Sequence, residues 1–179
     1  AALVRLKVDV IVTSASQETL AAKEATNTIP IVMINVGDPV GSGFVASLAR
    51  PGKNITGLST VSPELSGKRL ELLKEIIPNL ARVAVLGDST SPDNAISLKE
   101  LELAAQVLKV KLQYLDVLSV NDIETSFRAA RKERVDAVLV LSSFLLTSQR
   151  RQIIDLAVKS RLPASYARPE FVESGGLMT

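Results

Sequence analysis

Short runs of β-branched residues alternate along this chain with stretches of helical periodicity, and this alternation constrains the fold more than any other feature. The runs predict strands at Val8–Val12, Ile31–Val36, Val83–Leu86, Leu112–Val117, Ala137–Leu141 and Pro163–Tyr166. The periodic stretches predict helices at Thr19–Ala25, Gly67–Ile77, Asn94–Leu108, Val120–Glu133 and Ser148–Ser160. Strand and helix that alternate about every 25 residues are typical of βαβ units, with parallel strands and helices on both faces of the sheet. The sequence therefore predicts an α/β fold.

The alternation is interrupted at Arg50–Ser66, where no amphipathic helix joins one strand to the next. Residues 50–54 have the composition of a turn, and a short extended segment follows at Ile55–Ser59. We interpret Asn54–Pro63 as a crossover between two α/β lobes. This interpretation assigns residues 1–58 to the C-terminal part of a first lobe and 59–179 to most of a second. One long surface loop within a single sheet is the alternative, but structureless connections of that length are uncommon.

Cysteine and histidine are both absent from the 179 residues. Their absence excludes thiol nucleophiles, thiolate metal sites and an imidazole base. A serine nucleophile would need a lysine or carboxylate base, and no lysine lies beside the serine-rich strand ends. Asp38 and Asp88 are a conceivable acid–base pair, although nothing in the sequence fixes their separation. The sequence therefore predicts a binding protein rather than an enzyme, without a metal or a cofactor.

Charge and hydropathy limit the classes of partner that the sequence predicts. The 21 basic residues are nearly balanced by 19 acidic ones, and they lie mostly on predicted helices beside Glu and Asp. A nucleic-acid binder would gather its basic residues on one face and add stacking aromatics, so no nucleic-acid partner is predicted. No stretch approaches the roughly 18 apolar residues of a membrane span.

Polar residues follow the predicted strands at the ends where open parallel α/β sheets bind ligands. The candidate site residues are Thr13, Ser14, Gly37, Asp38, Ser89, Thr90, Ser91, Asn94, Ser142, Ser143 and Tyr166. Hydroxyls, backbone N–H groups at helix starts, a carboxylate and an aromatic ring are the groups that hold a small polar ligand. Helix capping is the alternative role for any single one of the short polar residues. Together they predict a small-molecule site.

The glycine-rich residues 37–43 invite comparison with phosphate-binding loops. They contain no GxGxxG pattern, and Pro39 lacks the backbone N–H that a phosphate cradle would use. We interpret the segment as a turn into a short helix at Phe44–Ala49, with Asp38 at the edge of the site.

Several longer segments resemble one known family. Residues 37–43, GDPVGSG, and 48–59, LARPGKNITGLS, resemble a signature of the ABC-transporter substrate-binding family whose characterised members bind tryptophan and similar ligands. Residues 68–75, KRLELLKE, continue the similarity, as do residues 148–151, 162–164 and 170–178. The resemblance extends over essentially the whole chain.

The resemblance implies a type I periplasmic-binding-protein fold, in which two Rossmann-like lobes with parallel sheets flanked by helices surround a cleft. Full-length members of the family have a secretion signal and more of the first lobe before this segment, and a final strand and helices after it. We therefore expect the chain to be part of a longer protein with an incomplete first lobe. Exposed sheet edges, or a homodimer that covers them, are expected as well.

The function implied by the resemblance is that of a periplasmic or extracytoplasmic solute receptor. It would close on a small organic ligand, an amino acid or a related carboxylate or aromatic compound, by a hinge near Gly57–Ser62, and deliver it to a membrane permease. Ligand-facing positions would be Thr13, Ser14, Gly37 and Asp38 on the first lobe, and Ser89 to Asn94, Ser142, Ser143 and Tyr166 on the second.

One departure from the family pattern bears on the ligand. Amino-acid binders often have an aspartate after the fifth strand, where this chain has Ser142, Ser143 and Phe144. A carboxylate there would pair with an α-amino group, so its absence weakens the expectation of an amino acid. Tyr166 and Phe144 are the candidate stacking rings. The alternative functions are the ligand-sensing domain of a transcription regulator and an α/β enzyme acting on a small acid.

Overall fold

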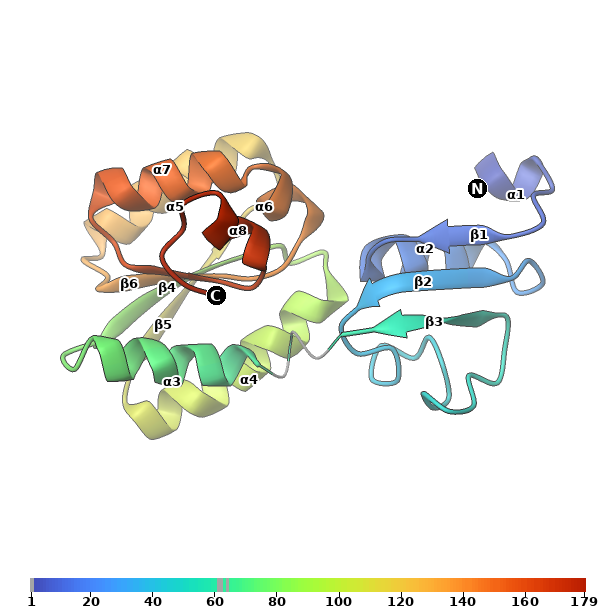
Figure 1. The fold of residues 1–179 in the computed structure, drawn as a ribbon, viewed down its shortest axis with the longest axis horizontal. Helices are drawn as coiled ribbons and strands as arrows, with labels where there is room; N and C mark the ends of the chain where they lie inside the picture. Colours follow the sequence, from blue (N-terminus) through green and yellow to red (C-terminus); the bar gives the residue numbers. More distant parts are fainter. Residues whose placement is uncertain (1, 61–62, 64) are drawn as a thin grey trace. The chain divides into compact units, whose positions relative to one another are not determined.

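The computed structural model describes residues 2–60, 63 and 65–179 (Figure 1). Its internal contacts divide the chain into two compact units. Unit 1 comprises Ala1–Pro63 with Ser91–Asp93, and unit 2 comprises Glu64–Thr90 with Asn94–Thr179. The boundary predicted between residues 58 and 59 falls within the strand β3 (Ile55–Ser59), and the assignment of lobes stays a prediction.

Unit 1 is a three-stranded parallel sheet with two helices. The strands β1 (Ile11–Thr13), β2 (Ile31–Val36) and β3 lie in the order β1-β2-β3, and the helices are α1 (Ala2–Arg5) and α2 (Ser16–Ala25). Ile11, Ile31 and Ile55 are register partners across the sheet and are all buried. They pack in one apolar cluster with Ala22 of α2 and with Phe44 of the loop between β2 and β3. The alternating residues Val12 and Leu58 are 61% and 69% exposed.

Two predictions in unit 1 are wrong. Ile55–Ser59 is not part of a crossover, because its backbone pairs with β2 as the third strand of the sheet. Phe44–Ala49 forms an irregular loop rather than a helix, because the N–H groups of Phe44 and Val45 both bond to the carbonyl of Pro39 and both side chains pack into the core. Residues 61 and 62, the end of the predicted hinge, lie outside the described residues.

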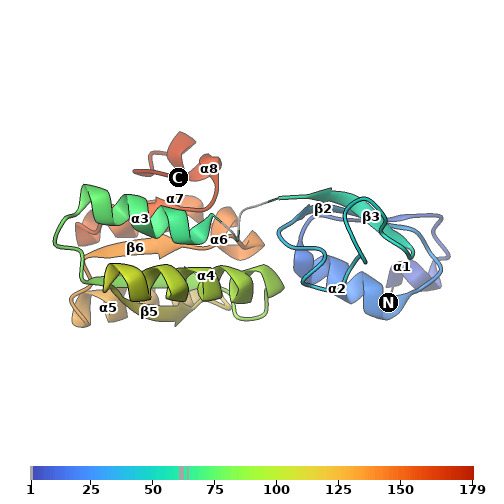
Figure 2. The same ribbon diagram turned by 90° about the horizontal axis from the view of Figure 1, so that it is seen from below.

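Unit 2 is a four-stranded parallel sheet between two helical layers. Its strands β4 (Arg82–Gly87), β5 (Lys111–Asp116), β6 (Ala137–Val140) and β7 (Ala164–Tyr166) lie in the order β5-β4-β6-β7. The helices α3 (Ser66–Ile76) and α4 (Pro92–Leu108) cover one face, and α5 (Val120–Lys132) and α7 (Arg150–Ser160) cover the other (Figures 1 and 2). The short helices α6 (Phe144–Ser148) and α8 (Pro169–Glu173) complete the unit.

The core of unit 2 is aliphatic on both faces of the sheet. Val83 and Leu139 belong to the cluster beneath α3 and α4, and Ala84 and Val138 to the cluster beneath α5 and α7. All four residues of β6 are buried. A strand buried on both faces needs an unbroken apolar run, which is why the β-branched runs predict these strands well.

The carboxyl ends of the four strands of unit 2 meet at one edge of the sheet. Gly87 pairs with Asp116, and Val140 pairs with both Leu86 and Tyr166. The segments that follow these strands therefore emerge side by side, and the topology itself brings the predicted site residues of unit 2 together.

The start of α5 offers a pH-dependent test of the fold. Hydrogen bonds from Ser119 to the Asp122 carboxylate lower the pKa of Asp122 below its ordinary value of 3.8. A carboxyl with a lowered folded-state pKa contributes stability above its unfolded pKa and loses it as the pH falls through the folded pKa. We expect Asp122→Asn to be less stable than wild type at pH 6 and to approach it below pH 3.8 in urea titrations. Ser119 and Asp122 form a capping box at the start of α5, and a stability difference independent of pH would contradict the role of the ionised Asp122 carboxylate in it.

Candidate ligand-binding site

In unit 1, the predicted site residues Thr13, Ser14 and Gly37 make contacts with residues close to them in the fold. Thr13 is buried, and its hydroxyl lies 2.7 Å from that of Thr19. The backbone N–H and hydroxyl of exposed Ser14 both donate to the Glu18 carboxylate, at 2.7 and 2.8 Å. Gly37 is buried, and a Cβ there would lie 2.5 Å from Cγ of Pro63. The hydroxyls of Thr13 and Ser14 are thus engaged within unit 1, and Gly37 is closely packed.

Asp38 begins the glycine-rich turn. Its carboxylate accepts the backbone N–H of Gly41 at 2.7 Å, which fixes the turn, and the side chain stays half-buried. Gly43 has φ +68°, a conformation that glycine adopts without strain. The segment thus folds as the turn that the sequence predicts.

The loop after β4 in unit 2 is organised by two carboxylates. Asp88 is buried and accepts both the backbone N–H and the hydroxyl of Thr90, at 3.0 and 2.6 Å. Asp116, the last residue of β5, accepts the backbone N–H and the hydroxyl of Ser89, at 2.9 and 2.6 Å. Ser89, Thr90 and Asp116 are exposed, so this corner presents a carboxylate and hydroxyls at the ligand end of the sheet.

Asn94 ties two strand ends together. Its side-chain oxygen accepts the N–H of Asp88 at 2.9 Å, and its side-chain nitrogen donates to the carbonyl of Ser142 at 2.6 Å. The residue is 2% exposed. Asn94 is therefore placed to hold the β4 and β6 loops in one arrangement, with its own polar atoms already occupied.

The loop after β6 presents two serine hydroxyls and an aromatic ring. Ser143 is the N-cap of α6, and its hydroxyl accepts the N–H of Leu146 at 3.1 Å. The half-buried Ser142 hydroxyl has no hydrogen-bond partner among the described residues. Phe144 is 74% exposed. A hydroxyl available for hydrogen bonding in the same loop as an exposed ring suits an aromatic ligand with a polar group.

Tyr166 and Ser91 are buried, as are the predicted residues Thr13, Gly37 and Asn94. Tyr166 is 1% exposed and stacks on Phe171 with ring centroids 4.5 Å apart, inside the core beneath α5 and α7. Ser91 is buried and groups with unit 1. The predicted ligand contacts of both side chains stay predictions.

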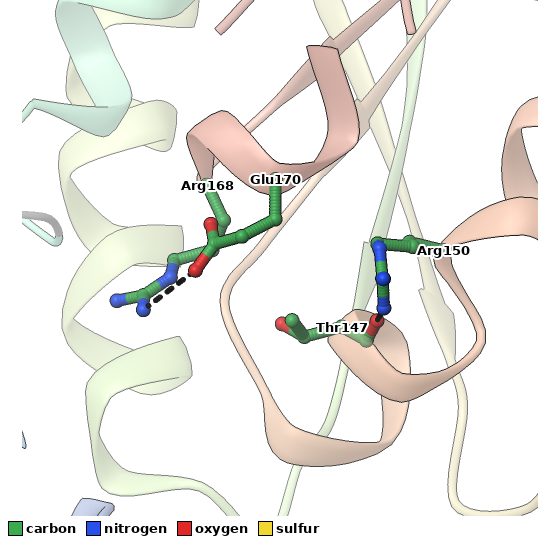
Figure 3. Close-up of polar contacts among 4 residues, drawn as sticks. All are labelled: Thr147, Arg150, Arg168 and Glu170. Atoms are coloured by element: carbon green, nitrogen blue, oxygen red, sulfur yellow. Dashed lines mark hydrogen bonds and ion pairs between the residues drawn. The ribbon is translucent and has the colours of Figure 1, made fainter. Parts of the chain in front are cut away.

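Three charged side chains lie around the loop after β7. Arg168 donates to Glu170 at 3.2 Å, while the guanidinium of Arg150 is turned toward the carbonyl of Thr147, at 3.4 Å (Figure 3). The backbone N–H of Glu170 itself, then the charges of Arg168 and Arg150, lower the pKa of the Glu170 carboxyl. This end of the edge therefore carries two cations and one ionised carboxylate.

Sequence reasoning missed Asp116 and Tyr114. The predicted strand ran to Val117, which placed Asp116 inside it, whereas β5 ends at Asp116. The hydroxyl of Tyr114 and the side-chain oxygen of Asn94 pack closely against Gly87. A Cβ added at Gly87 would lie 2.8 Å from each of these two oxygens. Burial, and then the charges of Asp116 and Asp88, raise the pKa of Tyr114 to about 12, so its hydroxyl is protonated and able to donate at neutral pH. The sequence did contain a signal for this pair, because Asp116 is a carboxylate at the end of a strand and Tyr114 precedes it by two residues.

Neither a metal site nor a membrane-spanning helix is found among the described residues. Among the described residues, no cluster of three or more acidic side chains is arranged to hold a metal ion. In the same residues, no helix combines the length and the apolar character needed to cross a membrane.

Comparison with known proteins identifies the family. The model of the ABC transporter substrate binding protein family matches residues 1–179. The chain belongs to this family. A tyrosine-binding protein of Clostridioides difficile (strain R20291) is 27% identical over 172 residues, which are 96% of this chain and 49% of that protein. The chain thus spans about half the length of this curated relative.

Two solved structures show the same fold. A conserved domain protein of Vibrio cholerae is 35% identical, with a TM-score of 0.85 over 98% of this chain and 58% of that one. A domain from Streptococcus pneumoniae in complex with L-Trp is 25% identical, with a TM-score of 0.83 over 96% of this chain and 59% of that one. The predicted α/β fold of the type I periplasmic-binding-protein class is confirmed. The family is one of substrate-binding proteins, and the second of these structures contains L-Trp.

Proposed function

We propose that this member of the substrate-binding family is part of the extracytoplasmic solute receptor of an ABC importer. It binds a small organic ligand, an aromatic amino acid or a related carboxylate, and delivers it to a membrane permease. The observation that carries the proposal is the family match over the whole of residues 1–179. The proposed receptor binds its ligand without chemical turnover.

The ligand class is supported by two relatives and by the site. One relative is named for binding tyrosine and another is solved with L-Trp, and both compounds join an aromatic ring to a carboxylate. In unit 2, the exposed ring of Phe144 and the Ser142 hydroxyl offer partners for a ring and a polar group. The predicted contacts at Ser89, Thr90, Asp38 and Ser14 are retained in this proposal as the polar surroundings of the ligand.

Thermal unfolding of the full-length protein tests the proposal. At a concentration 100 times its Kd, a ligand of the folded state adds about 2.7 kcal/mol to the free energy of unfolding. We expect L-tryptophan or L-tyrosine to raise the Tm by several degrees, and L-aspartate and ribose to leave it unchanged. No stabilisation by any aromatic or carboxylated solute would contradict the proposal.

The cellular location, the membrane permease and a homodimer are further parts of this proposal. Extracytoplasmic location follows from the role of the family, and delivery to a permease follows from coupling to an importer. A homodimer that covers exposed sheet edges stays a prediction, which the elution volume in size-exclusion chromatography would test.

A further inference from the structure

Arg69 is a buried cation in unit 2 without a buried anion beside it. It lies on α3, 7% of its surface is exposed, and Arg69 and Asp88 are the charged residues buried among those described. The ion pairs in the described part of the chain are Lys68–Glu71 and Arg168–Glu170, so neither includes Arg69. A buried charge is costly unless it is paired, which makes an unpaired guanidinium inside a stable unit unusual.

The guanidinium lies at the ligand end of the sheet. One terminal nitrogen donates to the carbonyl of Val140, the last residue of β6, at 3.1 Å. The other donates to the hydroxyl of Ser66 at 3.2 Å. Ser142, whose hydroxyl is available, follows Val140 by two residues, and the exposed ring of Phe144 follows by four.

The guanidinium has donors to spare. An arginine side chain carries five N–H donors. Two of them make the bonds to Val140 and Ser66, which leaves three, and none of these has an acceptor among the residues that the structure describes. Buried donors in folded proteins are nearly always satisfied by protein, water or ligand. Burial lowers the pKa of Arg69 to about 10, and the group is still protonated at neutral pH.

We propose that Arg69 is the anion anchor of the ligand site, and that it pairs with the carboxylate of the bound ligand while the ring packs near Phe144. This inference rests on the proposed function and names the group that its site recognises. A carboxylate would use the spare N–H groups in a charge-assisted contact and would neutralise the buried charge. The bonds to Val140 and Ser66 hold the guanidinium in place.

A purely structural role is the competing explanation, because Arg69 also bonds to the end of β6. The Val140 carbonyl has a second donor, the backbone N–H of Ala167 at 3.1 Å. Removing the guanidinium therefore leaves that carbonyl paired, and we expect Arg69→Met to fold. Circular dichroism and urea unfolding establish that before any binding measurement.

The test uses the full-length protein and two pairs of compounds that differ in the carboxylate. Isothermal titration calorimetry compares L-tryptophan with tryptamine and L-tyrosine with tyramine. The wild type should prefer the acid in each pair, and Arg69→Met should weaken binding of the acid by roughly 30-fold or more while binding of the amine changes little. Arg69→Lys should keep part of the preference. Lys68→Met, which removes an exposed cation from the same helix, should keep all of it.

The outcomes separate the two proposals. Equal weakening of acid and amine in Arg69→Met would show a structural role and overturn the anchor, while the proposed function stands. Failure of the wild type to bind any of the four compounds would overturn the anchor, and it would overturn the proposed function as well if no other aromatic or carboxylated solute raises the Tm. If Arg69→Met does not fold, the side-chain N–H resonance of Arg69 in the wild type decides the matter. It should shift with L-tryptophan and not with tryptamine, and the absence of a shift with L-tryptophan would overturn the anchor.

Discussion

Replacing Gly57 by alanine is expected to destabilise unit 1 by about 3 kcal/mol or more. Gly57 lies in β3 with φ +148°, a conformation that side chains of L-residues rarely adopt. It faces Met33 of β2 in the register of the sheet, and an added Cβ would overlap the Met33 carbonyl oxygen and lie 2.7 Å from the Met33 nitrogen. The close approach is between backbones, so no side chain can move aside. Glycine is required at this position for β3 to pair with β2.

Urea unfolding and hydrogen exchange measure this effect. Gly57→Ala should lower the unfolding midpoint and remove protection from the backbone amides of β2 and β3. Gly175→Ala is the matched control, because Gly175 also has a positive φ, +100°, but nothing lies within 4 Å of the added Cβ. It should cost only the conformational strain, about 1 kcal/mol. Equal losses in the two variants would contradict the steric explanation.

Replacing Asn94 by leucine is expected to lower the stability of unit 2 by about 2 to 4 kcal/mol. Leucine has a similar shape but can neither accept the N–H of Asp88 nor donate to the carbonyl of Ser142. Each polar group left buried without a partner costs about 1 to 3 kcal/mol. Loss of the link between the β4 and β6 loops should also weaken ligand binding, because Ser142 is no longer held in place.

Two comparisons make the Asn94 prediction specific. Asn121→Leu changes an exposed asparagine on α5 in the same way and should alter the free energy of unfolding by less than about 0.5 kcal/mol. Asn94→Asp keeps the acceptor for Asp88 but sets a buried carboxylate oxygen against the Ser142 carbonyl, so its unfolding midpoint should also fall at neutral pH and should recover at acid pH, where the protonated carboxyl can donate to that carbonyl. Urea titrations of Asn94→Leu and Asn121→Leu with the same midpoint would contradict a structural role for the two hydrogen bonds.

Strands made of largely apolar runs were predictable because such runs leave a strong signal in the sequence. Ile31–Val36 was predicted with the bounds that β2 has in the structure, and the β6 strand differed by one residue at its end. β3 was not recognised as part of the sheet, since its residues after Ile55 are exposed and Gly57 reads as a turn residue. The helices α6 and α8, five residues each, are too short to show a period.

The site was predictable as a place rather than as a set of contacts. Strand order brings the polar loops of unit 2 to one edge, and that follows from the βαβ pattern. The sequence could not show which side chains are used up locally, as Ser143 is by α6, nor that Tyr166 turns into the core. Arg69 left a readable signal, because it lies on the buried face of α3 with Leu70 and Leu73, where an apolar residue is expected.

The central claim is that the carboxyl edge of the unit 2 sheet binds a carboxylated aromatic ligand. A ¹H–¹⁵N correlation spectrum of the full-length protein, titrated with L-tryptophan, tests it most directly. We predict concentration-dependent shifts of the backbone amides of Ser89, Ser142 and Phe144 and of the Arg69 side chain. Shifts confined to the groove of about 320 Å³ whose lining includes Val158, Leu162 and Leu177 would contradict the claim, as would the absence of shifts in unit 2.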